Sequence, residues 1–398
     1  MKLSVIFKWI GIAAILWPAF EASAAPKAAN VPPVRHVFLI VLENESYGQT
    51  FGRNSLAPYL SKVLPAQGVL LQNFYGIGHN SLDNYIAMIS GQAPNAATQN
   101  DCQSFTEFSG NKLDKDGQAI GSGCVYPANV KTIADQLARA RLSWKEYAED
   151  MGNDLAREAS SCGHPPLNSI DNTQKAEAAD QYATRHNPFV YFHSIIDSPV
   201  CKTNVVNFSG LQHDLESAAT TANFVFITPN LCNDGHDGGR KKKTCADGRP
   251  GGLVSADAFL KQWVPIILKS PAFKQDGLLI ITFDEADVDV RYDASKHAYL
   301  EKEGDASACC GEPAGPNIDS SQTVFGAPDE GPGIIGPGGG RIGAVLLSPF
   351  IKPGTVSVTP YNHYSLLRTL EDIFGLQHLG YAAQPELKTF GSDVFENK

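Results

Sequence analysis

The chain has 398 residues, of which 43% are hydrophobic and 19% are charged. This composition is typical of a folded globular protein and excludes a disordered chain. The formal net charge of −10 argues against a general nucleic-acid binder, because DNA or RNA phosphates would be repelled without a strong basic patch. The one basic run, Arg240 to Lys243, fits either a solvated loop or a cationic rim for an anionic substrate.

Residues 1–24 have the pattern of a secretory signal peptide. Lys2 and Lys8 precede an apolar stretch that ends at Phe20, and Ala22-Ser23-Ala24 offers a cleavage site. The apolar stretch is shorter than the ~20 residues of a membrane span, and no later segment approaches that length. We therefore expect a secreted or periplasmic protein with no stable membrane insertion.

The eight cysteines indicate disulfides in an exported protein, because their number is even and they form no repeated CxxC pairs of the kind that hold zinc. The sequence leaves the connectivity open. Neighbouring Cys309 and Cys310 cannot easily bond each other without strain. The remaining candidate pairs are Cys102/Cys124, Cys162/Cys201 and Cys232/Cys245.

Short apolar runs alternate with helical patterns along the chain. Four runs have the length and composition of buried parallel strands, at residues 36–42, 224–228, 278–283 and 343–348. Apolar residues three and four positions apart predict helices in 55–64, 130–140, 256–268 and 363–374. This alternation predicts an α/β protein, a three-layer αβα sandwich around a mainly parallel sheet.

Two segments interrupt the alternation, one near 92–129 and one near 287–340. Both are rich in Gly, Ser, Asn and Asp and poor in periodic apolar residues. We expect them to be loop insertions in a single domain that covers residues 25–398. The second is long enough to frame a substrate pocket, although a solvated insertion fits equally well.

Polar groups follow three of the predicted strands. Glu43-Asn44 follows the first, Asn233 to Asp237 lies shortly after the second, and Asp284-Glu285 follows the third. Each group alone is also typical of a turn or a helix start. Ligands bind beyond the carboxyl ends of parallel strands, so the three groups are expected to converge there. Their oxygen and histidine ligands suit Mg, Mn, Ca or Zn.

The stretch GHNSLDNYIAMISG places Ser81 where an apolar helix begins. A helix cap is the simple interpretation of a serine or asparagine at this position. The positive end of the helix dipole and a neighbouring metal would also activate the Ser81 hydroxyl as a nucleophile. Asn84, one turn later, would then direct its amide toward a phosphoryl oxygen.

Eight blocks of sequence, in order, resemble the secreted phosphoesterases of the alkaline phosphatase superfamily, a group that includes acid phosphatases and phospholipases C. Among these blocks are HVFLIVLENESYGQTFG, GHNSLDNYIAMISG, RHNPFVYF, FVFITPNLCNDGHDG and LLIITFDEAD. The resemblance covers nearly all of the chain that follows the signal peptide. It implies an alkaline-phosphatase-like fold and one or two divalent metal ions, because the Glu43-Asn44 pattern belongs to the branch that works with one.

The resemblance also implies roles for individual residues. The implied metal ligands are Glu43, Asn44, Ser81, Asp234, Asp284 and Glu285. The implied catalytic residues are Ser81 as nucleophile, Asn84 as phosphate-orienting amide, His79 as proton donor to the leaving group, and His236 and His363 as phosphate contacts or further ligands. Surface or structural roles are expected for His36, His164, His186, His193, His213, His297 and His378.

These expectations describe a secreted, metal-dependent phosphoesterase that acts on small phosphate esters. An acid phosphatase that forms a phosphoserine from monoesters is the main prediction. A phospholipase C-type phosphodiesterase is the alternative, because the same nucleophile and metal serve both reactions. A non-catalytic exported binding protein is less favoured, since the chain keeps Ser81, Glu43 and Asp284.

Overall fold

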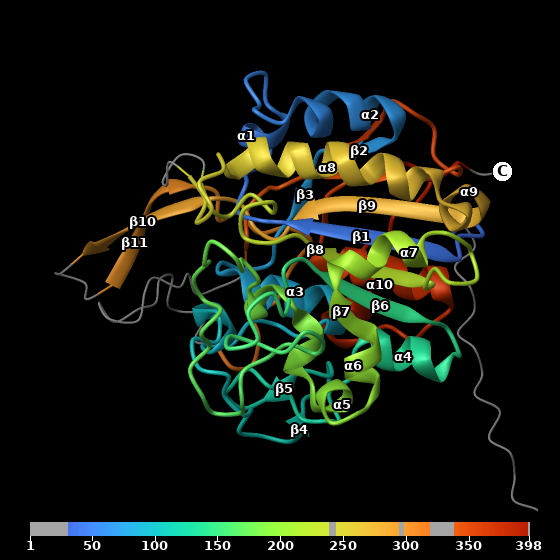
Figure 1. Cartoon of the computed structure of the whole chain (residues 1–398). Coiled ribbons are helices and arrows are strands. Elements are labelled where there is room, and N and C mark those ends of the chain that lie inside the picture. Colours follow the sequence, from blue (N-terminus) through green and yellow to red (C-terminus); the bar gives the residue numbers. More distant parts are fainter. Residues whose placement is uncertain (1–30, 239–243, 294–297, 319–337, 397–398) are drawn as a thin grey trace, which may run out of the picture.

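The computed structural model describes residues 31–238, 244–293, 298–318 and 338–396. The proposed signal peptide, the basic run Arg240 to Lys243 and His297 lie outside the described residues. At the centre is an eight-stranded sheet with helices on both faces (Figure 1). In spatial order its strands are β13 (Thr355–Ser357), β2 (Val69–Leu71), β12 (Ala344–Leu347), β9 (Gly277–Phe283), β1 (His36–Leu42), β8 (Phe224–Thr228), β6 (Trp144–Ala148) and β7 (Val205–Asn207). The expected αβα sandwich is confirmed.

The middle of the sheet consists of the strands that the apolar runs predicted. Every residue of β1 is buried, and β1 pairs in parallel with β8 and, along its full length, with β9. The run at 343–348 forms β12, but this strand is antiparallel to β9 and β2, so its predicted direction was wrong. Strand β12 begins with Ala344 opposite Thr282, near the carboxyl end of β9. The chain therefore re-enters the sheet beside the end at which β9 leaves it, and β12 runs in the opposite direction.

Three of the four helical patterns are confirmed, in α4 (Ile133–Arg139), α8 (Gly252–Lys269) and α10 (His363–Phe374), and the helix expected to begin at Ser81 is α3 (Ser81–Ser90). The pattern at 55–64 forms instead a π-helical turn, η1 (Tyr59–Val63), that continues into α2 (Leu64–Gln67). Pro65 explains this, because it has no N–H with which to make the α-helical hydrogen bond to Ser61. The other helices are α1 (Tyr47–Phe51), α5 (His193–Ile196), α6 (Val200–Asn204), α7 (Leu211–Asp214) and α9 (Pro271–Asp276).

Two-stranded sheets accompany the two expected insertions. The first insertion contains the hairpin of β4 (Lys112–Leu113) and β5 (Ala119–Ile120). The second begins with β10 (Val288–Asp293) and β11 (Ala298–Gly304), which project from the body at the end toward which β1 and β9 point (Figure 1). A third small sheet pairs β3 (Phe74–Tyr75) with β14 (Tyr361–Asn362).

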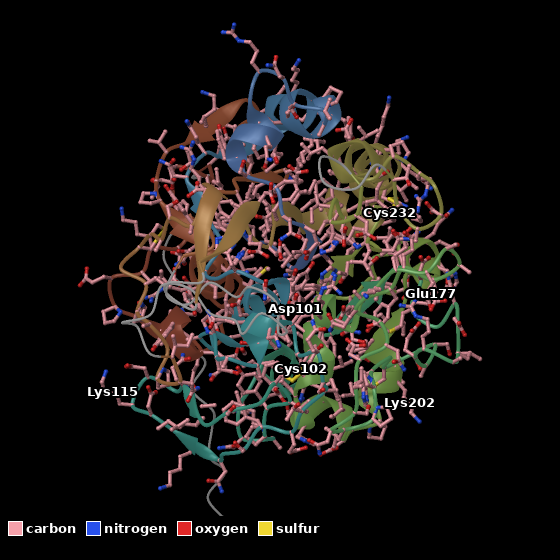
Figure 2. The ribbon with its side chains drawn as sticks, turned by 90° about the vertical axis from the view of Figure 1, so that its left-hand side faces the viewer. Asp101, Cys102, Lys115, Glu177, Lys202 and Cys232 are labelled. Atoms are coloured by element: carbon pink, nitrogen blue, oxygen red, sulfur yellow. A yellow bond between two sulfur atoms is a disulfide. The ribbon has the colours of Figure 1, made fainter. Side chains whose placement is uncertain are left out.

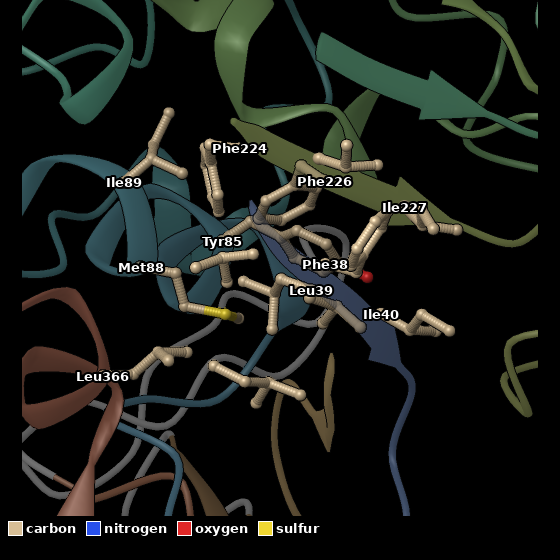
Figure 3. Packing of buried hydrophobic residues seen from close by; sticks show 14 of the residues in the cluster. Phe38, Leu39, Ile40, Tyr85, Met88, Ile89, Phe224, Phe226, Ile227 and Leu366 are labelled. Atoms are coloured by element: carbon tan, nitrogen blue, oxygen red, sulfur yellow. The ribbon is translucent and has the colours of Figure 1, made fainter. Parts of the chain in front are cut away.

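Helix α3 is fixed to the sheet by buried apolar side chains. Tyr85 and Met88 of α3 lie against Phe38 of β1 and Phe226 of β8, and Leu366 of α10 closes the other side (Figure 3). Each fully buried side chain of this size contributes about 1.5–3 kcal/mol to folding. The position of Ser81 at the start of α3 is therefore set by the core.

The disulfides agree with three expected pairs and add a fourth. Cys102–Cys124, Cys162–Cys201 and Cys232–Cys245 are bonded as expected. Cys309 and Cys310 are also bonded, against expectation. Cys310 has a φ of 67° and lies in a turn. Within the described ranges, no helix combines the length and apolar character needed to cross a membrane.

Candidate active site

The polar groups that follow β1, β8 and β9 meet at one edge of the sheet. The backbone N–H of Asn44 donates to Asp284 Oδ1 at 3.0 Å. The backbone N–H of Glu43 donates to the carbonyl oxygen of Asp234 at 2.9 Å. Glu43, Asp234 and Asp284 are each 0% exposed. The structure therefore brings together three carboxylates that are far apart in sequence.

Ser81 is the first residue of α3 and faces Glu43. Its hydroxyl donates to Glu43 Oε2 at 2.7 Å. The residue before the helix is Asn80, and the backbone N–H of Leu82 donates to Asp101 Oδ1 at 3.0 Å. Capping is thus carried by Asp101, and the Ser81 hydroxyl is directed into the carboxylate cluster.

His186 lies in the site, contrary to the surface or structural role expected for it. Its Nε2 is 3.3 Å from Glu43 Oε2, and its Nδ1 is 3.3 Å from Asp234 Oδ2. The ring stacks on Tyr85 with centroids 5.2 Å apart. Burial lowers the pKa of His186 well below its usual value, and the neighbouring Arg185 lowers it further. The local sequence RHNPF has no periodicity that would have placed His186 at the site.

The carboxylates have unused acceptor capacity. Glu43 Oε1, Asp234 Oδ2 and Asp284 Oδ2 are buried and accept no hydrogen bond from any described residue. Burial raises the pKa of all three carboxyls, and for Glu43 the charges of Asp284 and Asp234 raise it further. Such a cluster is unfavourable without a cation. Hard oxygen donors of this kind are the ligands that divalent metal ions prefer, and a metal at this cluster stays a prediction.

Glu285 connects Asn44 to His79. Asn44 Nδ2 donates to Glu285 Oε1 at 2.8 Å, while Glu285 Oε2 contacts His79 Nδ1 and accepts the Asn80 N–H at 3.3 Å. Both Glu285 oxygens therefore have protein partners, and its role as a metal ligand stays a prediction. His79 is 2% exposed, and its Nε2 has no hydrogen-bond partner among the described residues.

Asn84 closes the turn before Ser81. Its side-chain oxygen accepts the N–H groups of Ile77 at 2.8 Å and Gly78 at 3.3 Å, and its Nδ2 donates to the Gly78 carbonyl at 3.0 Å. These bonds direct the amide toward the backbone of the turn. The phosphate contact predicted for Asn84 stays a prediction.

His236 and His363 reach the site from different elements. The His236 backbone N–H donates to Asp234 Oδ1 at 2.8 Å, and its ring centroid is 6.1 Å from that of His186. His363 begins α10, and its Nε2 donates to the Asp284 carbonyl at 2.5 Å. Burial lowers the pKa of His363 to about 4, so the ring is neutral and supports the backbone of Asp284.

Five other histidines lie away from this cluster, and their contacts fit the surface or structural roles expected for them. His36 pairs with Asp276 at 2.5 Å, His193 with Asp197 at 2.9 Å, and His378 with Asp372 at 2.8 Å. His164 stacks on Phe105, and exposed His213 lies near Glu216.

Sequence comparisons match residues 54–377 to the model of the Phosphoesterase family. An acid phosphatase of Aspergillus fumigatus is 26% identical over 66% of this chain and 49% of its own length. A phosphate-repressible acid phosphatase of Penicillium chrysogenum is 27% identical over 81% of this chain and 55% of its own. The chain thus spans about half the length of these fungal relatives. A phosphatidylinositol-3-phosphatase of Mycobacterium tuberculosis is 24% identical over 96% of this chain and 88% of its own.

Solved structures with a similar fold include the alkaline phosphatase PafA, at 11% identity and a TM-score of 0.46, covering 92% of this chain and 99% of that one. Another is a protein of the alkaline phosphatase superfamily from Vibrio parahaemolyticus, at 12% identity and a TM-score of 0.45, covering 92% of this chain and 75% of that one. The family model covers well over half of the sequence. The chain belongs to the Phosphoesterase family.

Proposed function

We propose that the protein is a metal-dependent phosphoesterase, an acid phosphatase that hydrolyses small phosphate monoesters through a phosphoserine at Ser81. The observation that carries this proposal is the bond from the Ser81 hydroxyl to the buried Glu43 carboxylate at the start of α3. The similarity to the two fungal acid phosphatases supports the same reaction class.

A metal ion is part of the proposal because of the charge in the site. A phosphate ester would be repelled by three bare carboxylates. One or two divalent ions (Mg, Mn, Ca or Zn) would neutralise that charge and polarise the phosphoryl oxygens. The residues that would hold them are Glu43, Asn44, Ser81, Asp234, Asp284 and Glu285.

The first step forms a bond between Ser81 Oγ and phosphorus and breaks the bond from phosphorus to the ester oxygen. Glu43 Oε2 accepts the hydroxyl hydrogen bond and takes its proton. The N-terminal end of α3 stabilises the negative charge that develops on Oγ. In the second step water attacks phosphorus, the bond from phosphorus to Oγ breaks, inorganic phosphate leaves, and Oγ recovers its proton from Glu43.

His79 is the proposed proton donor to the leaving alcohol. Its Nδ1 contacts Glu285, so the ring is oriented while Nε2 stays available to the substrate. A histidine held by a carboxylate in this way can serve as general acid and then as general base for the attacking water. His236, His363 and Asn84 remain proposed phosphate contacts.

An apolar groove beside the site favours a second candidate, a phospholipase C-type phosphodiesterase. A cavity of about 440 Å³ is lined by Glu45, which directly follows Asn44, and by Leu56, Leu253 and Val254. Leu56 is 64% exposed and Val254 is 44% exposed. This groove would accept an apolar part of an ester, such as the glycerolipid part of a phospholipid.

We also infer that the protein works outside the cytoplasm, because all eight cysteines form disulfides and such bonds persist in oxidising compartments. The non-catalytic binding protein remains the weakest candidate. Its expected signature is loss of the nucleophile or of a metal ligand, whereas this chain keeps Ser81, Glu43 and Asp284, and the Ser81 hydroxyl donates to Glu43.

The experiment that tests the function is hydrolysis of a chromogenic phosphate monoester and the matching diester by the purified protein, across pH and with and without a chelator. Monoester turnover with an acidic optimum that chelation abolishes supports the acid phosphatase. Preference for the diester supports the phosphodiesterase. Turnover of neither ester after metal is restored contradicts both and leaves the binding protein.

A further inference from the structure

A further cavity lies at the carboxyl ends of the strands next to β8. Glu149 and Asp150 directly follow β6, Asn207 is the last residue of β7, and Asn233 lies in the loop after β8. Together with the middle of α8, these residues line a cavity of about 520 Å³. None of the lining residues is a proposed catalytic residue or metal ligand, so the cavity is separate from the carboxylate cluster.

Aromatic rings from α8 and from the turn after β7 form one wall of the cavity. Phe208 is 5% exposed and Phe259 is 4% exposed, whereas Trp263 is only partly buried. The ring centroid of Trp263 lies 4.5 Å from that of Phe208 and 6.5 Å from that of Phe259. Two buried rings therefore hold the indole in place, and part of the indole stays accessible.

The polar side chains of the cavity are held in place by the protein. Glu149 accepts the backbone N–H of Asn230 at 3.0 Å and the side-chain amide of Asn233 at 2.9 Å. Asp150 accepts the side-chain amide of Asn230 at 2.7 Å and the backbone N–H of Gln181 at 3.1 Å. A carboxylate offers about four acceptor positions, so both groups can accept a further donor. Side chains that are already ordered lose little entropy when a ligand binds.

Arg249 forms the wall of the cavity beside the Cys232–Cys245 disulfide. Its Nη1 donates to Asn233 Oδ1 at 2.6 Å, and its Nε donates to Asp247 Oδ2 at 2.6 Å. Cys232, labelled at the right of Figure 2, directly precedes Asn233. The disulfide thus joins the segment of Asn233 to that of Arg249, and this side of the cavity is tied covalently.

The lining favours one class of ligand over others. Glu149 and Asp150 would repel an anion, Arg249 would repel a cation, and the polar groups would lose hydrogen bonds to water against an apolar chain. A pyranose ring has C–H groups on its faces, which pack against aromatic rings, and hydroxyl groups at its edge, which bond to carboxylates and amides. The volume is within the range of small-molecule sites, about 300–1,000 Å³.

We propose that this cavity binds a neutral saccharide. Trp263 provides the apolar surface for a sugar ring, and Glu149, Asp150 and Asn207 accept or donate hydrogen bonds to its hydroxyl groups. Saccharide binding here does not depend on the phosphoesterase function proposed above, because the two sites share no residue.

The test is saturation-transfer NMR of the purified protein with the methyl glycosides of glucose, galactose and mannose, and with maltose and cellobiose. We expect at least one of these sugars to bind with a Kd on the order of 1 mM, because a ligand of this size makes few contacts. Trp263→Ala should raise that Kd at least about 10-fold, since it removes the aromatic surface. Trp263→Phe should raise it less.

Ala258→Trp is the second variant, and it tests the cavity even if Trp263→Ala does not fold. Ala258 lines the cavity and is exposed on α8, so an indole there fills the space without entering the core. Lys261→Trp is the matched control, because Lys261 is exposed on the same helix and does not line the cavity. Ala258→Trp should abolish saccharide binding and leave the hydrolysis of a small phosphate ester unchanged, and Lys261→Trp should change neither.

Absence of binding to every sugar of the panel at about 50 mM overturns the proposal. Equal saccharide binding by the parent and Ala258→Trp also overturns it. Choline chloride is the probe for an organic cation, and binding of choline in place of any sugar, lost in Ala258→Trp, would assign the cavity to a different ligand. A parent that binds a sugar here but hydrolyses no phosphate ester supports the saccharide site and contradicts the proposed function.

Discussion

The hydroxyl of Ser81 donates to Glu43 Oε2 at 2.7 Å, although the two residues belong to different elements of the fold and lie 38 positions apart. One end of this contact is fixed by the packing of α3 and the other by the middle strand of the sheet. Because this buried hydroxyl donates to a carboxylate and not to the backbone of its own helix, it is placed to act as a nucleophile rather than as a helix cap.

Ser81→Ala should reduce phosphoester turnover by at least about 1,000-fold while the protein keeps its fold, because it removes the nucleophile but only one buried hydroxyl. Loss of that hydrogen bond costs about 1 kcal/mol of stability. Steady-state kinetics and thermal unfolding measure the two effects. Ser90→Ala is the matched control, because Ser90 is a buried serine at the other end of α3 whose hydroxyl donates to Ile86. Substantial activity in the Ser81 variant would rule out Ser81 as nucleophile.

Asp284→Asn should lower the content of bound metal, because it removes one of the three buried carboxylates. Elemental analysis of the purified variant, together with activity at increasing metal concentration, measures this. Asp276→Asn is a suitable control, since Asp276 is also buried but pairs with His36 at the opposite end of β9 and β1. Equal metal content in the Asp284 variant and the parent would exclude Asp284 as a ligand.

Chelation should lower the melting temperature of the parent protein. Without a cation, Glu43, Asp234 and Asp284 are buried close together with unmatched oxygens. Any metal that binds the folded state alone stabilises it by mass action. Thermal unfolding with and without a chelator checks this, and Asp284→Asn should show a smaller shift than the parent. An unchanged melting temperature in the parent contradicts a metal at this cluster.

His79→Ala should impair turnover in a way that depends on the leaving group. An alkyl alcohol needs a proton as it departs, whereas a nitrophenol with a low pKa does not. We expect a loss of about 100-fold or more on alkyl phosphates and a much smaller loss on nitrophenyl phosphate. His378→Ala serves as control, because His378 pairs with Asp372 away from the cluster. Equal losses on both substrates would exclude His79 as proton donor.

Much of this site could be predicted from the sequence, because several of its residues lie at the ends of regular strands and helices. Glu43, Asp284 and Ser81 lie directly at the ends of an apolar strand or helix, where periodicity defines the boundary and the sheet defines the neighbourhood. Arg185 and His186 lie in a short 3-10 turn that has no periodicity. Their places in the site depend on tertiary packing, which the local pattern does not contain.

The fold, like the site, has parts that the sequence pattern predicted and parts that it did not. Strand β6 was not predicted, because it carries Lys145 and Glu146 among its five residues. Glu146 is nevertheless 0% exposed: Thr228 Oγ1 donates to it at 3.2 Å, and burial raises its pKa well above the usual value. The direction of β12 was missed for a related reason. An apolar run shows that both faces are buried, but it does not show which way the strand runs.

Glu158 predicts how stability depends on pH. It is 4% exposed, and its Oε1 accepts the N–H of Gly152 at 2.7 Å. Burial, with a contribution from Asp180, raises the pKa of Glu158 to about 8. A glutamate in the unfolded chain has a pKa of about 4.3, so between these values the folded protein holds a proton that the unfolded chain releases. The free energy of unfolding should therefore fall as pH rises from about 5 to about 8.

Glu158→Gln isolates this contribution, because the amide can still donate to Asp180 but does not titrate. Urea unfolding at several pH values should show a flatter pH dependence in this variant than in the parent, and greater relative stability above pH ~8. Exposed Glu177→Gln should keep the parent's pH dependence. Parallel curves for parent and Glu158→Gln would show that Glu158 is ionised in the folded protein at neutral pH. Its unbonded Oε2 would then need another donor, since no described residue supplies one.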